Sequence, residues 1–573
     1  MKGERAVFQE KSRFLAALGM TRSVKTIPKS GFLARKERGL GMTIAGGVAT
    51  VLLGGMVCSG LVPVARAQVT AQRLLDSARE PRNWLMYSGD YAGRRYSTLD
   101  QIRTSNVSSL VPKWAYQTMA GGKFEATPLV VDGVLYATGA DDRAFALDAR
   151  SGRPIWQYQR ALPPDIRPCC GRVNRGMAIL GDKVFLGTLD AHVIALDTRT
   201  GNVVWDVGTS DYNKGYSITL APLVIKNLVL IGVSGGEYGI RGFIDAYDGA
   251  TGARKWRFYT VPGPGEPGHE TWEGDSWKIG GAPAWITGTY DAATNTTFWT
   301  TGNPSPSNRG EGRGGDNLYS NSLLALDPDT GKLKWHFQFT KHDEHDYDAT
   351  QVPVLVDEGD RDLILQANRN GFFYVIDRAS GKLVSATPYG RVTWSNAKDA
   401  SGVPIERKEA SPTLTGVPVC PGALGATNWF SPSYDPQTKL FYVTAREQCD
   451  IFSTAPQPYD AGHAFYGSAY FPNDDSQPFW GAVRAIDPAT SQIKWELKHL
   501  SPSWSGVLST AGGLIFTGDA EGNFMALDAA SGKILWHFQC GASVYASPMT
   551  YAIDGKQYVA IAAGSTLFAF GLP

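Results

Sequence analysis

Three stretches of the sequence gather carboxyl and amide side chains that could bind a metal ion. The densest is His342-Asp343-Glu344-His345-Asp346-Tyr347-Asp348, and the shorter ones are Ser234-Gly235-Gly236-Glu237 and Gly302-Asn303-Pro304. Carboxylates and an amide carbonyl are hard oxygen donors, which suit calcium, magnesium or a lanthanide rather than zinc or copper. Each stretch alone is a weak signal, because most acidic loops are simply solvated. No third ligand accompanies His342 and His345 at a suitable spacing, so we expect these two histidines to be loop residues.

The cysteines form a second group with possible chemistry. Cys169 and Cys170 are adjacent, and such a pair can close a strained eight-membered disulfide ring, although each cysteine can also pair elsewhere. Without the N-terminal segment described below, five cysteines remain, at positions 169, 170, 420, 449 and 540. Pairing 169 with 170 and 420 with 449 leaves Cys540 single. The sequence alone does not fix this connectivity.

A repeated element must position these residues. It consists of an apolar strand, then Ala-Leu-Asp or a close variant, then Gly four residues and Trp eight residues after the Asp. Full copies have their Asp at 148, 197, 248, 327 and 528, and degraded copies have it at 377 and 487. The Asp side chain can cap a tight turn in which the Gly takes a positive φ. A strand hairpin precedes most copies, so each repeat holds about four short strands, which is typical of a β-propeller blade.

The repeats predict an all-β fold, an eight-bladed β-propeller with four-stranded antiparallel blades, formed by residues 68–573 as one domain. The gap of 110 residues between Asp377 and Asp487 has room for an eroded eighth blade around Ser433–Ala445. Trp114 resembles a final-strand residue without its blade, which suggests that an N-terminal strand closes the ring. Several separate β-sandwiches are the alternative, but no linker-like segment separates the copies. The blade tryptophans are expected to be structural, at 156, 205, 256, 335, 495 and 536.

The N-terminus has the features of an export signal. Residues 1–38 are basic and polar, an apolar stretch follows to about residue 64, and Ala65-Arg66-Ala67 ends it. This pattern predicts a signal peptide, residues 1–67, that is cleaved after Ala67. An uncleaved membrane anchor is the alternative, since the apolar run is long enough to span. The true start could also be Met20 or Met42.

The remaining chain is mildly acidic. Residues 1–67 hold 11 of the 55 Lys/Arg and 3 of the 54 Asp/Glu, which leaves 44 basic and 51 acidic residues and a formal charge of −7. The absence of a basic stripe argues against nucleic acid as a partner. No later segment has 18 consecutive apolar residues, so no stable membrane insertion is expected after cleavage. We expect a periplasmic protein, in a compartment where disulfides persist.

Taken together, the motifs resemble those of the pyrroloquinoline quinone (PQQ)-dependent alcohol dehydrogenases, the quinoprotein methanol and ethanol dehydrogenase family. The resemblance covers nearly all of residues 83–571. Its landmarks are the segments 169–176, 234–242, 272–275, 302–304, 315–317, 342–346, 510–513 and 518–522. The separation of Cys420 and Cys449 is similar to that of a second disulfide in the family. The resemblance implies an enzyme that oxidises primary alcohols to aldehydes by hydride transfer to PQQ.

It also implies roles for individual residues. PQQ would lie between a Cys169–Cys170 disulfide and the indole of Trp285, which could otherwise be a core residue. The further cofactor contacts would be Glu125, Arg175, Thr219, Ser234, Gly235, Arg369 and Asn428. Arg369 would face the reactive quinone edge, although an Arg at a blade end could be a surface residue. The metal ligands would be Glu237, Asn303, Asp346 and Asp348, with Asp346 also acting as the general base.

Asp348 bears on the identity of the metal. Calcium members of the family tend to carry a small residue two positions after the catalytic Asp, whereas lanthanide members have the Asp-x-Asp pattern of this chain. An additional anionic ligand suits a trivalent ion, so the resemblance favours a lanthanide, with calcium as the alternative. A base so close to a cation keeps a low pKa, which favours activity at raised pH.

The expected partners follow from the same resemblance. No Cys-x-x-Cys-His motif for a c-type haem occurs in the sequence. Electrons would therefore pass to a separate soluble cytochrome c, and the substrate would be a small alcohol. A homodimer is possible. Two other functions stay open: a non-catalytic exported propeller scaffold, and a PQQ dehydrogenase for polyols or aldehydes.

Overall fold

The computed structural model of this protein describes residues 68–119, 121–473 and 478–573. The chain divides into two compact units, Met1–Ala65 and Arg66–Pro573, and the described residues lie in the second. The predicted signal peptide, residues 1–67, lies outside the described residues. Within the described ranges, no helix has the length and apolar character needed to cross a membrane.

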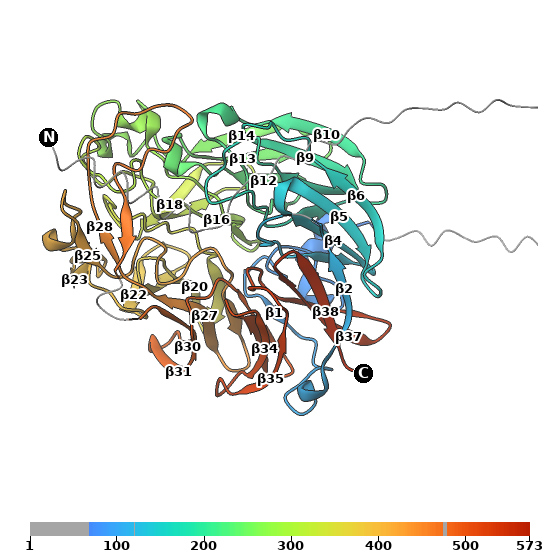
Figure 1. Cartoon of the computed structure of the whole chain (residues 1–573). Coiled ribbons are helices and arrows are strands. Elements are labelled where there is room, and N and C mark those ends of the chain that lie inside the picture. Colours follow the sequence, from blue (N-terminus) through green and yellow to red (C-terminus); the bar gives the residue numbers. More distant parts are fainter. Residues whose placement is uncertain (1–67, 120, 474–477) are drawn as a thin grey trace, which may run out of the picture. The chain divides into compact units, whose positions relative to one another are not determined.

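Strands dominate the described part of the chain (Figure 1). Eight sheets each contain four antiparallel strands, which follow the sequence order in seven of the sheets. The first four sheets are β3–β6 (Leu129–Val131, Val134–Gly139, Arg143–Asp148, Pro154–Gln159), β7–β10 (Ala178–Leu180, Lys183–Gly187, His192–Asp197, Val203–Gly208), β11–β14 (Leu223–Ile225, Leu228–Gly232, Phe243–Asp248, Arg254–Tyr259) and β15–β18 (Thr289–Asp291, Thr296–Thr300, Ser322–Leu326, Leu333–Gln338).

The next three sheets follow the same order, and the eighth sheet combines both ends of the described chain. They are β19–β22 (Val354–Glu358, Arg361–Ala367, Phe372–Asp377, Leu383–Pro388), β26, β27, β30 and β31 (Ser433–Asp435, Leu440–Glu447, Trp480–Asp487, Gln492–His499), β32–β35 (Val507–Thr510, Leu514–Gly518, Asn523–Asp528, Ile534–Gln539), and β36–β38 with β2 (Met549–Ile553, Lys556–Ala563, Thr566–Gly571, Val111–Gln117).

Smaller elements decorate these sheets. The strand β1 (Tyr96–Ser97) pairs in parallel with β32, and β23 (Ser395–Lys398) pairs with β24 (Pro404–Glu406). A three-stranded sheet joins β25 (Val417–Val419), β28 (Asp450–Phe452) and β29 (Tyr470–Pro472). The short helix α2 (Ala71–Leu75) begins after Thr70, whose hydroxyl accepts the N–H of Arg73.

The repeated Asp and Gly build the same turn between the third and fourth strands of six of the eight sheets, as the sequence predicts. In the third sheet, Asp248 Oδ1 accepts the backbone N–H of Ala250 and of Thr251, and Gly252 follows with φ +74°. Strands in the middle of the sheets are buried along their whole length, as in β12, whereas last strands such as β10 keep one face exposed. This burial explains the continuous apolar runs before each Ala-Leu-Asp.

The blade tryptophans connect each sheet to the next. The indole N–H of Trp156 donates to the Thr198 carbonyl at 2.9 Å, and that of Trp205 donates to the Gly249 carbonyl at 3.2 Å. The same bond recurs from tryptophans 256 and 495, and Trp536 donates to Leu110 just before β2. Where the fifth sheet lacks its Trp, the hydroxyls of Ser385 and Ser491 lie 3.1 Å apart instead.

Ring closure confirms the predicted role of the N-terminal strand. β2 pairs with β38, so that Trp114 lies opposite Ala569 (Figure 1). The Trp114 indole then donates to the Ala149 carbonyl of the first sheet at 3.1 Å. Together with the contact between β15 and β19, these bonds link the eight sheets in a closed cycle, and the predicted all-β propeller with four-stranded antiparallel blades is confirmed.

One detail of the predicted ring is wrong. The segment Ser433–Ala445 is not a separate eighth blade, because β26 and β27 pair with β30 and β31 and belong to the blade of Asp487. The long gap in the repeat instead reflects insertions before β26 and between β27 and β30. The eighth blade is the one that β2 closes.

The antiparallel order of each sheet decides where side chains for a site can gather. In a blade of four antiparallel strands, the loop before the first strand and the loop between strands two and three lie at the same end. The Asp-Gly turns between strands three and four lie at the opposite end. First strands of neighbouring sheets, such as β7 and β11 or β26 and β32, contact each other, so these loops converge.

The tight contact between turn and indole gives a testable prediction. A Cβ on Gly201 (φ +72°) would lie 2.6 Å from Trp156 Cε3, whereas one on Gly181 (φ +64°) would meet nothing within 4 Å. Gly181→Ala should therefore show the backbone cost alone, about 1–2 kcal/mol. Gly201→Ala should add overpacking and lower the free energy of unfolding by about 2–5 kcal/mol in total. Equal losses in urea unfolding of the two variants would contradict this account of the blade contact.

Candidate functional site

The convergent loop ends enclose a cavity of about 310 Å³. Of the fourteen residues that the sequence analysis singled out, all but Asn303 line it: Glu125, Cys169, Cys170, Arg175, Thr219, Ser234, Gly235, Glu237, Trp285, Asp346, Asp348, Arg369 and Asn428. Each lies before the first strand of a sheet or between strands two and three, in agreement with the topology. Their roles stay predictions, and their placement in one cavity is what the structure adds.

Arg175 organises one side of the cavity. Its Nη2 lies 2.8 Å from Glu125 Oε2, and its Nη1 donates to Thr219 Oγ1 at 2.8 Å. The Thr219 hydroxyl in turn lies 2.8 Å from that of Ser234. The guanidinium lies between two indoles, 5.0 Å from the ring of Trp285 and 4.8 Å from that of Trp429. Arg175 is therefore both charge-paired and held between aromatic faces.

Arg369 organises the opposite, acidic side. Its Nη1 lies 2.5 Å from Asp348 Oδ2, and its Nη2 lies 3.1 Å from Asp346 Oδ2. The other oxygen of Asp348 accepts the backbone N–H of Asn303 at 2.7 Å. This approach requires Gly302, because a Cβ there would lie 2.1 Å from Asp348 Oδ1. The Asp-x-Asp pattern thus places two carboxylates on one guanidinium.

Two buried oxygens on this side have no hydrogen-bond partner among the described residues, Asp346 Oδ1 and Asn303 Oδ1. Asn303 does not line the cavity, and its amide oxygen lies close to Gly236, where a Cβ would be 2.9 Å away. The neighbouring residue Glu237 is half-buried, and its carboxylate lies with the Cys169 and Cys170 sulfurs, ligand atoms within 4.8 Å of one another. The carboxylates of Glu237, Asp346 and Asp348 form no such group among the described residues, so the structure brings the predicted ligands into one cavity without bringing all of their oxygens together.

Burial and mutual repulsion govern the acid–base behaviour of the two aspartates. Burial raises the pKa of Asp346 well above its usual range, the Arg369 charge lowers it, and the Asp348 and Glu237 charges raise it again. Burial likewise raises the pKa of Asp348 to about 6, while Arg369 lowers it. The pKa of Asp346 is raised because the guanidinium does not outweigh desolvation, and the low pKa expected for Asp346 beside a bound cation stays a prediction.

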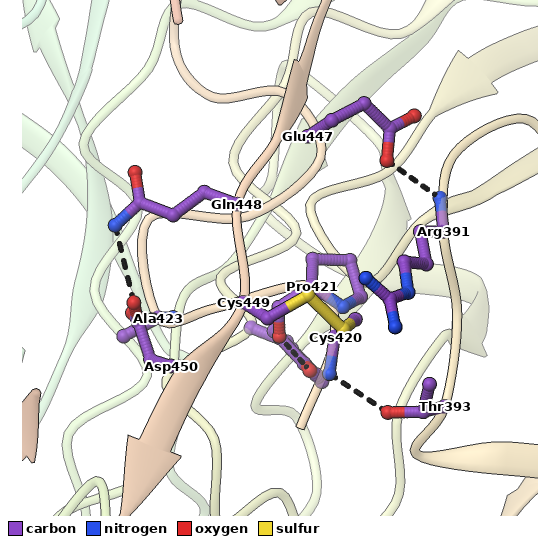
Figure 2. Close-up of a disulfide and its surroundings, with 10 residues drawn as sticks. Arg391, Thr393, Cys420, Pro421, Ala423, Glu447, Gln448, Cys449 and Asp450 are labelled. Atoms are coloured by element: carbon purple, nitrogen blue, oxygen red, sulfur yellow. Dashed lines mark hydrogen bonds between the residues drawn. A yellow bond between two sulfur atoms is a disulfide. The ribbon is translucent and has the colours of Figure 1, made fainter. Parts of the chain in front are cut away.

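The cysteine pairing agrees with the sequence analysis in part. Cys420 and Cys449 form a disulfide (Figure 2), and Cys540 is free. The expected Cys169–Cys170 disulfide is absent, and both residues are free thiols. A bond between adjacent cysteines needs a strained ring, and here Cys170 takes a left-handed φ of +65° without closing one.

Sequence reasoning missed seven residues of the cavity wall: Lys123, Val173, Leu424, Trp429, Tyr466, Tyr470 and Trp504. Trp429 directly follows the predicted contact Asn428, and this adjacency was the available signal. Tyr466 and Tyr470 lie in the insertion between β27 and β30, which also contains β28 and β29. No hydrogen bond from either phenol hydroxyl occurs within the described part of the chain, and burial raises the pKa of both phenols.

These features define a class: an all-β propeller whose loop face carries a cavity with aromatic and cationic walls on one side and crowded oxygen donors on the other. Comparison with known proteins places the chain within this class. The family model described as "PQQ: Glucose/ethanol/alcohol dehydrogenase, beta-propeller domain" matches residues 84–404 and 394–559. The chain belongs to the family of PQQ-dependent alcohol dehydrogenases.

Relatives and solved structures agree with this assignment. The quinoprotein alcohol dehydrogenase PedH of Pseudomonas putida is 40% identical, over 90% of this chain and 91% of the relative. The lanthanide-dependent methanol dehydrogenase of Methylacidiphilum fumariolicum is 36% identical, over 90% and 89%. The structure of a europium-containing methanol dehydrogenase superposes with a TM-score of 0.83 at 33% identity, covering 87% of this chain and 100% of that chain.

The residues present fit a quinone cofactor and a hard cation. Arg175, Arg369 and Lys123 offer positive charge to an anionic ligand, and Trp285 and Trp429 offer planar faces. On the acidic side, the partnerless Asp346 Oδ1 and Asn303 Oδ1 join the carboxylates of Asp348 and Glu237. Such a donor set, with oxygens only, is what calcium or a lanthanide prefers.

The Glu125–Arg175 pair gives a prediction that concerns stability alone. Both side chains are buried, so Glu125→Leu leaves an unpaired guanidinium in the cavity wall. In the protein without cofactor, this change should lower the free energy of unfolding by about 3–5 kcal/mol. The double variant Glu125→Leu with Arg175→Met removes both charges and should be more stable than the single variant. A double variant that is destabilised by the sum of the two single losses in urea titrations would show that the pair is uncoupled.

Proposed function

We propose that this protein oxidises primary alcohols to aldehydes by hydride transfer to PQQ, with a lanthanide ion at the acidic side of the cavity. The proposal includes export to the periplasm and transfer of electrons to a cytochrome c. One observation carries it: Asp346 has one oxygen held by Arg369 while the other is buried and unpartnered, in the cavity that Asp348 and Glu237 also line. A carboxylate held in this way is suited to accept a proton.

The two sides of the cavity divide the work of binding. Trp285, Arg175, Thr219, Ser234, Gly235, Glu125 and Asn428 would hold PQQ, and Glu237, Asn303, Asp346 and Asp348 would hold the cation. When bound, the cofactor supplies a two-electron acceptor for the hydride of the alcohol carbon, and the cation polarises the accepting carbonyl. The protein's own side chains bind and orient these groups and accept the proton of the alcohol.

Asp346 is the base that takes the proton of the alcohol hydroxyl, and Arg369 Nη2 holds its Oδ2 at 3.1 Å. The same guanidinium contacts Asp348, so it fixes both carboxylates relative to the cavity. Burial keeps water from solvating Oδ1, which makes the carboxylate a stronger base than an exposed one. Arg369 thus orients the base and limits the repulsion between two adjacent negative charges.

A trivalent cation fits the charge of this side better than a divalent one. Glu237, Asp346 and Asp348 together carry three negative charges when ionised, and Arg369 supplies one positive charge. Relatives named for a lanthanide and for europium share this fold and more than 30% of the sequence. Calcium is the alternative ion, and a comparison of activity with lanthanum and with calcium distinguishes the two.

The cavity wall supports a small alcohol as substrate. Leu424, Tyr466, Tyr470 and Trp504 line the cavity with large side chains and restrict its space. Export is supported by the Cys420–Cys449 disulfide, which persists in an oxidising compartment, and by the N-terminal pattern in the sequence. The cytochrome c acceptor and the possible homodimer stay predictions.

Reconstitution tests the proposal. The protein stripped of cofactor and metal should oxidise ethanol with an artificial electron acceptor only when PQQ and a metal are both added, and lanthanum should outperform calcium. Asp348→Ala removes one anionic ligand and should reduce the lanthanum-dependent kcat by about 100-fold, in the range for loss of a transition-state contact. Activity that needs neither PQQ nor metal would reject the proposal.

The matched control for this experiment is Asp316→Ala. Asp316 is exposed and its nearest cationic partner is Lys341 at 3.5 Å, so this variant should keep the wild-type kcat and metal preference. A wild-type protein that prefers calcium, with Asp348→Ala unchanged, would assign the site to calcium and remove Asp348 from the ligand set.

Cation binding should depend on pH because it must displace protons. Burial raises the pKa values of Asp346 and Asp348, so each carboxyl binds protons at higher pH than an ordinary aspartate. Lanthanide affinity should therefore be greatest above neutral pH and fall by about 10-fold for each proton displaced per pH unit below about 6. Terbium luminescence titrations between pH 5 and 8, with proton release measured in weak buffer, check this. An affinity that is constant over this range would contradict it.

A further inference from the structure

The chain segment 422–426 encloses Arg369 closely. The Ala423 carbonyl accepts Arg369 Nε–H at 2.8 Å and also accepts Nη2–H, while the Ala426 N–H donates to the Arg369 carbonyl at 2.9 Å. A Cβ on Gly425 would lie 2.0 Å from Arg369 Cγ. The backbone therefore holds the stem and one edge of the guanidinium, and the other edge faces Asp348 and Asp346.

Asp450 holds Ala423 in turn. Its Oδ2 accepts the Ala423 N–H at 2.8 Å, and its Oδ1 accepts Nε2–H of Gln448 at 3.1 Å (Figure 2). The Asp450 residue is 0% exposed. It has no ion-pair partner within 4.0 Å among the described residues. A buried carboxylate without a paired cation is costly, so its place needs a reason beyond packing.

The local fold fixes Asp450 relative to Ala423 from two sides. The Cys420–Cys449 disulfide joins the residue before Asp450 to the residue three before Ala423, and β25 pairs with β28 so that Val419 lies opposite Asp450. Gly422 lets the carboxylate approach, because a Cβ there would lie 2.4 Å from Asp450 Cγ. Figure 2 shows the disulfide, Ala423 and Asp450 side by side.

We propose that Asp450 is a positioning residue, which fixes Ala423 so that its carbonyl orients the Arg369 guanidinium toward Asp346 and Asp348. The inference rests on the proposed function, because it assigns Asp450 a part in holding the proton-accepting centre. Asp450 touches no reacting group itself, so its loss should affect the chemical step more than alcohol binding. Partners that orient such groups typically contribute 10–100-fold to activity.

The test compares Asp450→Ala with Asp450→Asn in the enzyme loaded with PQQ and lanthanum. Both changes remove the charge, but only Asn keeps an oxygen that can accept the Ala423 N–H. Asp450→Ala should lower kcat by about 10–100-fold with KM for ethanol nearly unchanged, and Asp450→Asn should recover most of that loss. The primary deuterium isotope effect on kcat should rise in the Ala variant, since hydride transfer becomes slower relative to the other steps.

A second perturbation keeps the proposal testable if Asp450→Ala does not fold. Gly422→Ala introduces a Cβ where the Asp450 carboxylate lies, at a position where the φ of glycine is not positive. It should give the same kinetic signature as Asp450→Ala. The matched control is Asp435→Asn, which changes a buried carboxyl in β26, in a different sheet from Asp450. The Asp435 Oδ1 accepts the N–H of Gln437 and has no bond to Ala423. This control should leave kcat and the isotope effect unchanged.

Hydrogen exchange provides a readout that does not need activity. In Asp450→Ala, the amide of Ala423 should exchange faster than in the wild type, and in Asp435→Asn it should not. Equal kcat losses in the Ala and Asn variants, or an Ala variant that behaves like Asp435→Asn, would overturn the proposal. A wild-type protein without alcohol oxidation would instead reject the proposed function, while the exchange of Ala423 would still decide whether Asp450 holds it.

Discussion

The crowding of negative charge at the loop face is the constraint on which the site depends. Asp346 and Asp348 are buried and share one guanidinium, and the negative charge of Glu237 reaches both. Charges in such a place repel strongly and are poorly hydrated, so they either bind protons or gain a cation. Arg369 supplies part of the compensation, and the partnerless oxygens of Asp346 and Asn303 mark where it is incomplete. The arrangement is therefore costly unless bound protons or a cation compensate the charge.

The closed ring of sheets offsets the unfavourable free energy of these buried charges. The sheets are linked from one indole to the next turn, and β2 closes the cycle on the C-terminal strands. These contacts lie at the Asp-Gly turns, at the end of the blades away from the cavity. The two ends of a blade are separate. The contacts between indoles and turns that stabilise the fold therefore do not depend on the buried carboxylates of the cavity, which cost stability. The strained, charged face is therefore supported by packing elsewhere.

The sequence predicts the parts that depend on local patterns and misses those that depend on contacts between distant segments. The Asp, Gly and Trp spacing is a property of one hairpin and its neighbour, so the repeat predicts blades and the closing strand at Trp114. The strands at Ser433–Ala445 lack a repeat of their own, and only their pairing with β30 shows their blade. The free thiols of Cys169 and Cys170 depend on backbone conformation rather than adjacency. Asp450 resembles any other loop acid until its contact with Ala423 is seen.

The insertion between β27 and β30 supplies several residues of the site, and because it lies outside the repeated sequence pattern, the repeat does not predict them. One end carries Cys449 and Asp450, which contact the segment that encloses Arg369. Further along, the Phe465 N–H donates to the Glu237 carbonyl at 2.6 Å, and the next residue, Tyr466, lines the cavity. A single excursion from one blade thus touches both the arginine and the glutamate sides of the acidic centre while it forms the wall beside Asp346. A change in the length of this segment cannot reshape the wall alone, since the same backbone holds Glu237 in place.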